Sequence, residues 1–201
     1  MTARVPDPND VSAYDAALDE ITVGGAQPLA APIEVRDYDP GWPRLYAREE
    51  ERIRWILGER VRRIEHVGST SVPGLPAKPL IDIVLEVSNS SDEPSYADDL
   101  EAGGYPLRIR EHDWYEHRVF KGPDTNVNLH VFTEGCEEVD RMIRFRDWLR
   151  DNEADRTLYA DAKRELAARD WKYVQQYADA KTAIVTEIMS RAEAAKQRGE
   201  A

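Results

Sequence analysis

The stretch IEHVGSTSVPGLPAKPLIDI, residues 64–83, decides the fold of this chain. Its first residues favour a short strand that ends at Val67, and a turn of glycine and hydroxyl residues, 68–71, follows directly. Over residues 80–87 every odd-numbered residue is apolar, whereas Asp82 lies on the other face. The stretch therefore predicts a turn between two strands, the second with one core face and one face free for chemistry.

Helical and strand patterns surround this stretch on both sides. Before it, Gly41-Trp42-Pro43 opens a helical pattern that ends at Gly58. After it, the patterns predict a helix over residues 96–102, strands over 107–110, 115–121 and 126–132, and helices near 137–150, 154–168 and 173–195. We therefore expect an α/β (α+β) fold with a mixed β-sheet flanked by helices.

The composition divides the 201 residues into three parts. Residues 1–32 are acidic and broken by glycine and proline, so we expect a flexible extension with a short helix at Val11 to Leu18. Residues 33–135 are expected to form the α/β core. Residues 136–201 have helical patterns and are expected to form a helical region packed on that core.

Charge and cysteine content exclude several classes of function. A formal charge of -12 argues against binding to a long nucleic acid, which needs a dense Lys/Arg surface. Cys136 is the only cysteine, the first residues lack the pattern of a secretory signal, and no run of about 18 apolar residues occurs. We expect a cytoplasmic protein that does not contact membranes; its oligomeric state stays open.

The turn after Val67 has the composition of a phosphate-binding turn. Its backbone N–H groups and hydroxyls can bind phosphate oxygens, although Gly-Ser turns are also common as plain structure. The P-loop motif and the G-x-G-x-x-G motif are both absent. A carboxylate on the next strand, Asp82, is placed to share a divalent metal between protein and nucleotide.

Residues 64–83 resemble the signature of the GrpB-like family, within the polymerase-β-type nucleotidyltransferase superfamily. The resemblance continues at Asn128-Leu129-His130-Val131, at residues 144–149 and at later lysine and tyrosine positions, so that it covers about residues 33–195. It implies a mixed sheet flanked by helices, with a nucleotide and a divalent metal bound at the Gly-Ser turn.

The metal ligands of this superfamily are only partly present. Val84 stands where the second acid of an Asp-x-Asp pair is expected, and Glu86 is ~13 Å from Asp82 along the strand, too far to share one ion. His130 is the best candidate for the third ligand position, with His66 or His117 nearby. A site of Asp82, His130 and His66 would accept Mg²⁺ or Mn²⁺, and Zn²⁺ is also possible. The histidines could instead contact substrate.

Several basic and polar residues could hold phosphates, or could be ordinary surface residues. Lys78 lies in a loop restricted by prolines, and Tyr177 and Lys181 are four residues apart on one predicted helix face. The candidate nucleotide-binding residues are Gly68, Ser69, Thr70, Ser71, Lys78, Arg118, Asn128, Arg144, Lys163, Tyr177 and Lys181.

Three functions remain open. The first is metal-dependent transfer of a nucleoside monophosphate from a nucleoside triphosphate to a small-molecule acceptor, with Asp82, His130 and His117 as catalytic residues. The second is a nucleotide- or coenzyme-binding module without transfer activity, which Val84 favours. The third is an altered metal-dependent enzyme that uses the same scaffold on a small metabolite.

Overall fold

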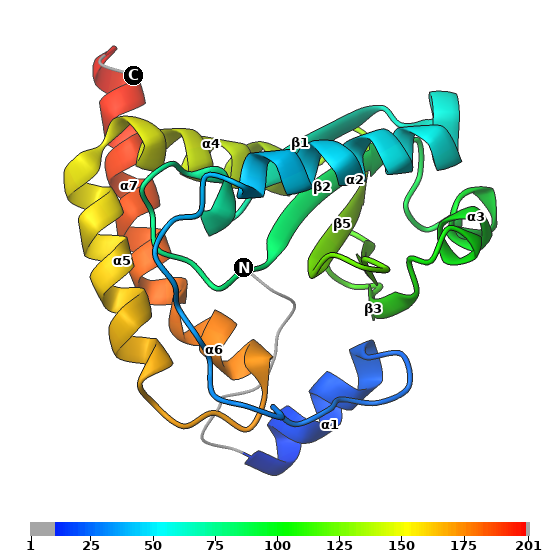
Figure 1. The fold of residues 1–201 in the computed structure, drawn as a ribbon, viewed down its shortest axis with the longest axis horizontal. Helices are drawn as coiled ribbons and strands as arrows, with labels where there is room; N and C mark the ends of the chain where they lie inside the picture. Colours follow the sequence, from blue (N-terminus) through cyan, green and yellow to red (C-terminus); the bar gives the residue numbers. More distant parts are fainter. Residues whose placement is uncertain (1–10, 200–201) are drawn as a thin grey trace.

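The fold is built on one five-stranded mixed sheet (Figure 1). The computed structural model describes residues 11–199. Its strands are β1 (Arg63–Val67), β2 (Ile81–Val87), β3 (Leu107–Glu111), β4 (His117–Lys121) and β5 (Val127–Thr133). They lie in the order β1-β2-β5-β4-β3, in which only β2 and β5 are parallel. The α/β class and the mixed sheet expected from the sequence are confirmed.

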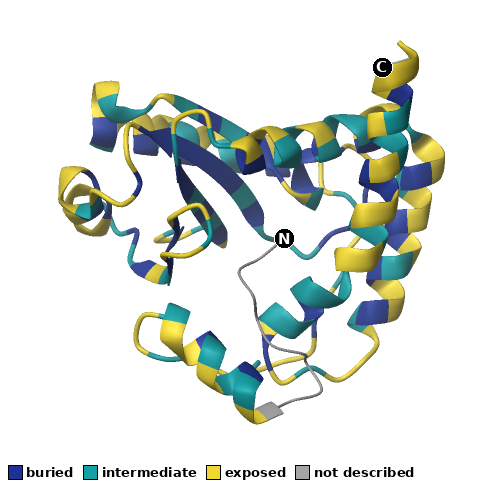
Figure 2. Cartoon of the chain, turned by 180° about the vertical axis from the view of Figure 1, so that it is seen from behind, coloured by how far each residue is buried: buried dark blue, intermediate teal, exposed yellow. Residues whose placement is uncertain are grey.

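One face of the sheet packs against α2 (Trp42–Leu57) and α3 (Ala97–Ala102). The odd-numbered apolar residues of β2 lie on this face and are buried with Ile53 of α2, as the alternation predicts. The sheet is buried along most of β2 (Figure 2). Pro43 stands in the first turn of α2, where its missing N–H is harmless, and Gly58 ends the helix with a φ of 56°.

The other face carries the polar residues and is partly covered by α4 (Glu137–Asp151). Val84 and Phe132 of the sheet pack there against Val139 of α4. The side chains of Asp82 and His130 lie on the same face and keep 25% and 18% exposure. One end of this face therefore stays open to solvent.

The helical region contains α5 (Glu153–Ala167), α6 (Val174–Ala180) and α7 (Thr182–Arg198). The single helix expected over 173–195 is wrong, because the chain turns at Lys181. Tyr177 of α6 packs with Ile33 and Leu166, whereas Ile188 of α7 belongs to a different cluster, and one straight helix would not reach both. No helix within residues 11–199 is long and apolar enough to cross a membrane.

The first described part of the chain forms the short helix expected from Val11 to Leu18, but this helix is docked and not part of a flexible extension. Residues 11–21 form α1 (Val11–Ile21), whose Tyr14 and Leu18 are buried, with Tyr173 in the same cluster. The Tyr14 hydroxyl donates a hydrogen bond to Asp179 Oδ2 at 2.7 Å. Tyr14 and Leu18 lie in a segment whose acidic composition does not indicate a buried helix. Residues 1–10 lie outside the described residues.

Candidate functional site

The Gly-Ser turn is pressed against the aspartate of the next strand. Gly68 has a φ of +70°, and Val67 pairs with Asp82 across β1 and β2. A Cβ atom added to Gly68 would lie 2.9 Å from the Cβ of Asp82 and would overlap its carboxylate. Glycine is therefore required both by the backbone angle and by the close approach of Asp82.

Replacing Gly68 with alanine is expected to destabilise the fold more than replacing Gly74. Both glycines have positive φ, but only open space surrounds Gly74. We expect Gly68→Ala to lose about 1–3 kcal/mol more in free energy of unfolding than Gly74→Ala, measured by urea denaturation. Equal losses would mean that the Asp82 side chain moves aside freely.

Two hydroxyls of the turn hold the turn itself. Thr70 Oγ1 donates to the Leu80 carbonyl at 3.0 Å, and Ser71 Oγ donates to the Gly68 carbonyl at 2.6 Å. Both side chains are buried. The structure therefore places Thr70 and Ser71, two of the expected nucleotide-binding residues, in structural roles, and it leaves the Ser69 hydroxyl facing the site.

His66 points away from Asp82, so the expected metal set of Asp82, His130 and His66 is wrong. In the register of β1 and β2, His66 pairs with Ile83, one residue out of phase with Asp82, and its side chain lies on the opposite face. Its ring stacks on Tyr46 with centroids 4.8 Å apart. Burial lowers the pKa of His66 to about 4, so the ring is neutral at physiological pH.

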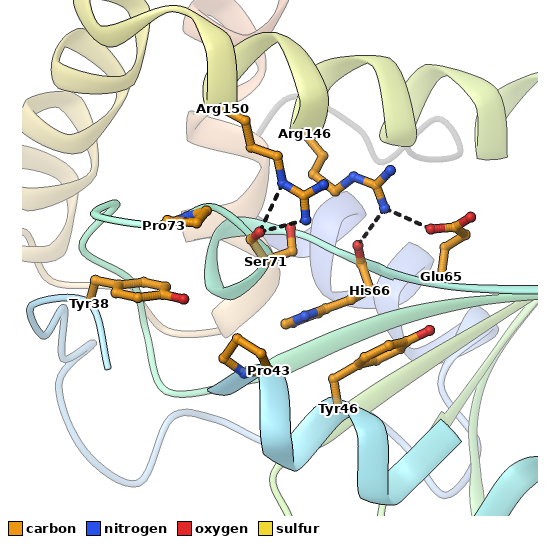
Figure 3. A pocket seen from close by; sticks show the side chains of 9 residues that line it. All are labelled: Tyr38, Pro43, Tyr46, Glu65, His66, Ser71, Pro73, Arg146 and Arg150. Atoms are coloured by element: carbon orange, nitrogen blue, oxygen red, sulfur yellow. Dashed lines mark hydrogen bonds and ion pairs between the residues drawn. The ribbon is translucent and has the colours of Figure 1, made fainter. Parts of the chain in front are cut away.

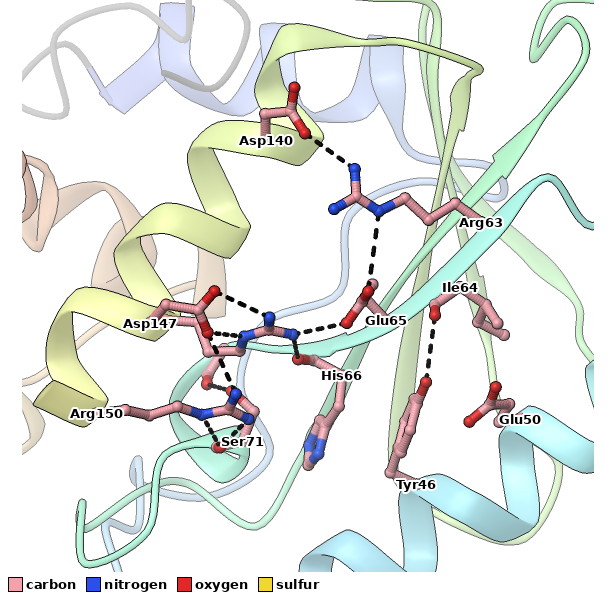
Figure 4. Close-up of polar contacts among 12 residues, drawn as sticks. Tyr46, Glu50, Arg63, Ile64, Glu65, His66, Ser71, Asp140, Asp147 and Arg150 are labelled. Carbon is pink, nitrogen blue, oxygen red and sulfur yellow. Dashed lines mark hydrogen bonds and ion pairs between the residues drawn. The ribbon is translucent and has the colours of Figure 1, made fainter. Parts of the chain in front are cut away.

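A separate cavity of about 340 Å³ lies behind the turn and is lined by His66 together with Glu65 from the other face of β1 (Figure 3). Two arginines of α4 line it and bind the backbone of the turn segment. Arg146 donates to Glu65 and to the His66 carbonyl (Figure 3), and Arg150 donates to the Ser71 carbonyl (Figure 4). These arginines hold the turn from the side of α4, through Glu65 on the polar face of the sheet and through two backbone carbonyls.

Arg144 and Arg118 are the other candidates that the structure separates from the site. Arg144 is exposed on α4, about 200° around the helix from the inward-pointing Arg146. Arg118 pairs with Val131 in register, which places it on the α2 face of the sheet, and its Nε donates to Glu93 at 2.6 Å. Both expectations were wrong about which side of the element faces the site.

Asp82 is the centre of a hydrogen-bonded group that spans three strands. Asn128 pairs with Asp82 in register and donates from Nδ2 to Asp82 Oδ1 at 3.0 Å. His130 Nε2 lies 3.6 Å from the same oxygen. Burial raises the pKa of Asp82, but the adjacent His130, the hydrogen bond from Asn128 and the charge of Lys181 outweigh it, so the pKa stays below its usual value.

Lys121 completes this group and was missed by the sequence reading. It pairs with Asn128 across β4 and β5, and its Nζ donates to Asn128 Oδ1 at 2.5 Å. Burial lowers the pKa of Lys121, while the charge of Asp82 opposes that shift. The alternation of β4 could have identified Lys121, because it lies in phase with His117 and out of phase with Arg118.

Three further lysines approach from loops and helices. Lys163 of α5 is 2% exposed; its Nζ donates to Ser69 Oγ at 2.9 Å and also to the Pro76 carbonyl. Burial, together with the charge of Lys181, lowers the pKa of Lys163 to about 6. Burial also lowers the pKa of Lys78, with Asp82 opposing and Lys181 assisting. Lys181 lies over the Tyr177 ring, 4.8 Å from its centroid.

A buried histidine connects the site to an acidic residue. His117 Nδ1 lies 2.7 Å from Glu111 Oε2, and His117 Nε2 lies 3.0 Å from His130 Nδ1. Burial lowers the pKa of His117 to about 4 although Glu111 opposes the shift. The His117 side chain is therefore buried behind His130 and does not line the open site.

The residues of this site do not fit a divalent metal held by protein ligands. Asp82 is the only carboxylate in the group, and within residues 11–199 no three His, Cys, Asp or Glu side chains could hold one ion. The position of the second acid belongs to Val84, which is fully buried beside Val67 and Phe132. Four lysines around one carboxylate instead give a net positive site that suits an anion.

Comparison with known proteins agrees with this fold. The family model described as GrpB protein matches residues 32–191. A UPF0157 protein from Halalkalibacterium halodurans is 59% identical over 92% of this chain and 95% of its own length. The crystal structure of conserved protein GrpB from Enterococcus faecalis is 31% identical with a TM-score of 0.70, over 79% of this chain and 96% of that one.

A more distant relative has a named activity. A dephospho-CoA kinase from Mycobacterium leprae is 30% identical over 83% of this chain, but the matched part is only 48% of that protein's length. The chain therefore resembles about half of a protein whose name refers to a nucleotide-containing coenzyme.

Proposed function

The chain belongs to the GrpB family, and from that membership and the geometry around Asp82 we propose that it binds the phosphates of a nucleotide. We further propose that it transfers the nucleoside monophosphate of a triphosphate to a small-molecule acceptor. The single observation that carries the proposal is the approach of four lysines to the Gly68-Ser69 turn and Asp82.

The lysines supply the charge that a polyphosphate requires. An ammonium group acts as a point charge with three donors, and its effect grows where burial excludes water. Lys163 is already hydrogen-bonded to Ser69, so a phosphate that enters the turn meets a hydroxyl and an amine that becomes an ammonium group as the phosphate binds. Because pyrophosphate leaves with added negative charge, the same lysines would stabilise the transition state.

A dedicated metal site is not part of this proposal. Lys78, Lys121, Lys163 and Lys181 neutralise charge where related sites are expected to use an ion, and the donor set holds one carboxylate only. Mg²⁺ or Mn²⁺ would then enter with the nucleotide, bound to its phosphates. Zn²⁺, which prefers several nitrogen or sulfur ligands, does not suit these residues.

A second candidate is binding of a nucleotide or coenzyme without transfer. The observation that favours it is the buried Val84, which leaves no room for a second acid. The name of the Mycobacterium leprae relative adds coenzyme A derivatives to the ligands worth testing. In both candidates the acceptor or ligand is small, because the net charge of -12 disfavours long nucleic acids.

A ligand screen tests both candidates. We expect nucleoside triphosphates or coenzyme A derivatives to raise the Tm, since a ligand that binds only the folded state stabilises it. Release of pyrophosphate by a stabilising triphosphate would support transfer, and its absence with every acceptor tried would leave binding alone. No stabilisation by any phosphate ligand, with or without Mg²⁺ and Mn²⁺, would reject both.

Lys181→Met is expected to weaken triphosphate binding about tenfold, because one charge contact of the site is lost. Lys196→Met is the matched control, since Lys196 is exposed in the last turn of the helix that Lys181 precedes. Both variants remove one positive charge from the chain. Isothermal titration calorimetry measures the two affinities, and equal losses would assign the effect to overall charge.

A further inference from the structure

Glu111, His117 and His130 form a line of hydrogen bonds, and His130 Nε2 at its end lies 3.6 Å from Asp82 Oδ1. Both ring nitrogens of His117 are engaged, Nδ1 with Glu111 Oε2 at 2.7 Å and Nε2 with His130 Nδ1 at 3.0 Å. The imidazole rings of His117 and His130 are nearly parallel, with 8° between their planes. The side chains of His117 and Glu111 are each 5% exposed, so water does not replace these bonds.

The order of donors along this line follows from the chemistry of each group. The Glu111 carboxylate can only accept, so His117 Nδ1 carries a hydrogen and donates it. A neutral His117 then has a lone pair on Nε2, which requires a hydrogen on His130 Nδ1. The remaining nitrogen of His130, Nε2, faces Asp82 Oδ1 at 3.6 Å.

We propose that Glu111 and His117 are positioning residues that hold His130 in its Nδ1–H tautomer, so that His130 Nε2 exchanges the proton of the reaction beside Asp82. The role in proton exchange rests on the proposed function, whereas the tautomers do not. His130 would be the catalytic residue, because its Nε2 is the atom that faces the site.

The surroundings of the line support a fixed geometry. Phe132 stacks on His117 with centroids 4.6 Å apart, and Trp114 meets the same ring edge-on at 5.1 Å. Two further charged groups act on the pair: Glu138 of α4 on His117, and Asp82 of β2 on His130. Glu138, like Glu111, favours a proton on His117, whereas burial and the charge of His130 oppose it.

The proposed step balances as follows. The acceptor hydroxyl gives its proton to His130 Nε2, and its oxygen forms a bond to the α-phosphorus. The bond between the α-phosphorus and its bridging oxygen to the β-phosphate breaks, and the electron pair leaves with pyrophosphate. The imidazolium of His130 then faces Asp82 at 3.6 Å, where the carboxylate stabilises the new charge.

Nuclear magnetic resonance of the histidine rings tests the tautomers without any assay of activity. The chain has four histidines. In ¹⁵N-labelled protein at pH 8, long-range ¹H–¹⁵N spectra are expected to show Nδ1–H for His117 and His130. His66 is expected as Nε2–H, because Thr70 uses its own hydrogen on Leu80 and must accept from His66. The exposed His112 is the internal reference. An Nε2–H tautomer for neutral His130 would overturn the proposal.

Two variants of His117 separate positioning from packing. His117→Gln retains a carbonyl oxygen that can accept from His130 Nδ1, whereas His117→Phe retains the ring and loses the acceptor. In the pyrophosphate assay we expect His117→Phe to lower kcat about a hundredfold with little change in KM, and His117→Gln to recover at least a tenth of the wild-type kcat.

The outcomes distinguish this inference from the proposed function. If wild-type protein releases no pyrophosphate, the transfer function and the proton exchange by His130 fail together, while the spectra still decide the positioning of its ring. If wild-type protein turns over and His117→Phe retains its kcat, the catalytic part of this inference fails and the proposed function stands. A spectrum of folded His117→Phe in which His130 keeps its Nδ1–H tautomer would show that His117 does not position it.

Discussion

Replacing Lys163 with methionine is expected to weaken triphosphate binding about a hundredfold while leaving the free energy of unfolding at pH 7 equal or higher. The side chain is 2% exposed, and burial lowers its pKa to about 6, so the fold bears the cost of removing an ammonium group from water. Methionine fills the same volume without that cost. It loses the bond to Ser69, which is worth about 1 kcal/mol.

The pH dependence of the free energy of unfolding measures the cost of burying Lys163. The pKa of Lys163 is about 6 in the folded chain and near its ordinary value of 10.5 when unfolded. Between these pH values the unfolded chain binds one more proton, so the contribution of Lys163 makes the protein more stable as pH rises. Below pH 6 both states hold the proton and the contribution is constant.

Urea denaturation at several pH values between 6.5 and 9 measures the difference. The wild-type free energy of unfolding should rise relative to Lys163→Met by up to about 1.4 kcal/mol per pH unit. Subtracting the variant removes the similar contributions of Lys78 and Lys121, whose pKa values are also lowered by burial. A variant that is several kcal/mol less stable at every pH would make Lys163 a structural residue.

Phosphate binding should also change the protonation of Lys163. A phosphate beside Ser69 favours the charged form of Lys163, whose pKa in the free protein is about 6, so binding at pH 8 is expected to take up a proton. Calorimetry in buffers of different ionisation enthalpy measures that uptake. In Lys163→Met the uptake should fall by the part that Lys163 contributes.

The strand pattern made the core of this fold predictable from sequence. The alternation over residues 80–87 places Asp82 opposite the apolar face, and the parallel pairing of β2 with β5 then brings Asn128 beside it. The register between β2 and β5 pairs segments that are distant in the sequence, and the alternation within each strand does not predict it. The resemblance at residues 128–131 supplied that link for the site.

Side chains on α4 and on β4 were harder to place. Arg144 and Arg146 differ by two positions, and the sequence alone does not show which side of α4 faces the sheet. Arg118 and Lys121 stand in the same strand on opposite faces, and the basic residue chosen from sequence was the one that pairs with Glu93. In α4 and β4 the sequence showed which side chains share a face, but it did not show which face borders the site.

Composition also concealed that part of the acidic N-terminal segment is buried. The first helix, 11–21, carries Asp15 and Asp19 on its surface, and it docks through Tyr14 and Leu18. Two apolar residues four positions apart form one helical stripe, which is too short to stand out against the surrounding charge. A docked helix of this kind is recognised only when the surface that it packs against is known.

Asp82→Asn is expected to abolish turnover and yet to bind triphosphate more tightly. Asparagine keeps the shape of the side chain and an acceptor for Asn128, but it removes the one negative charge that faces the lysines. Loss of that repulsion should improve the affinity for triphosphate about tenfold. Without the carboxylate the imidazolium of His130 loses its partner, and kcat should fall about a thousandfold.

The direction of the change in affinity separates two chemistries at the same residue. If Asp82 holds a divalent ion that in turn binds the phosphates, the amide weakens binding, and the loss depends on added Mg²⁺ or Mn²⁺. If the lysines bind the phosphates directly, the amide strengthens binding equally with and without chelator. Asp98→Asn, on α3 against the other face of the sheet, is the control for net charge. Calorimetry of the two variants, with and without chelator, therefore decides whether an anion site or a metal site lies at the Gly-Ser turn.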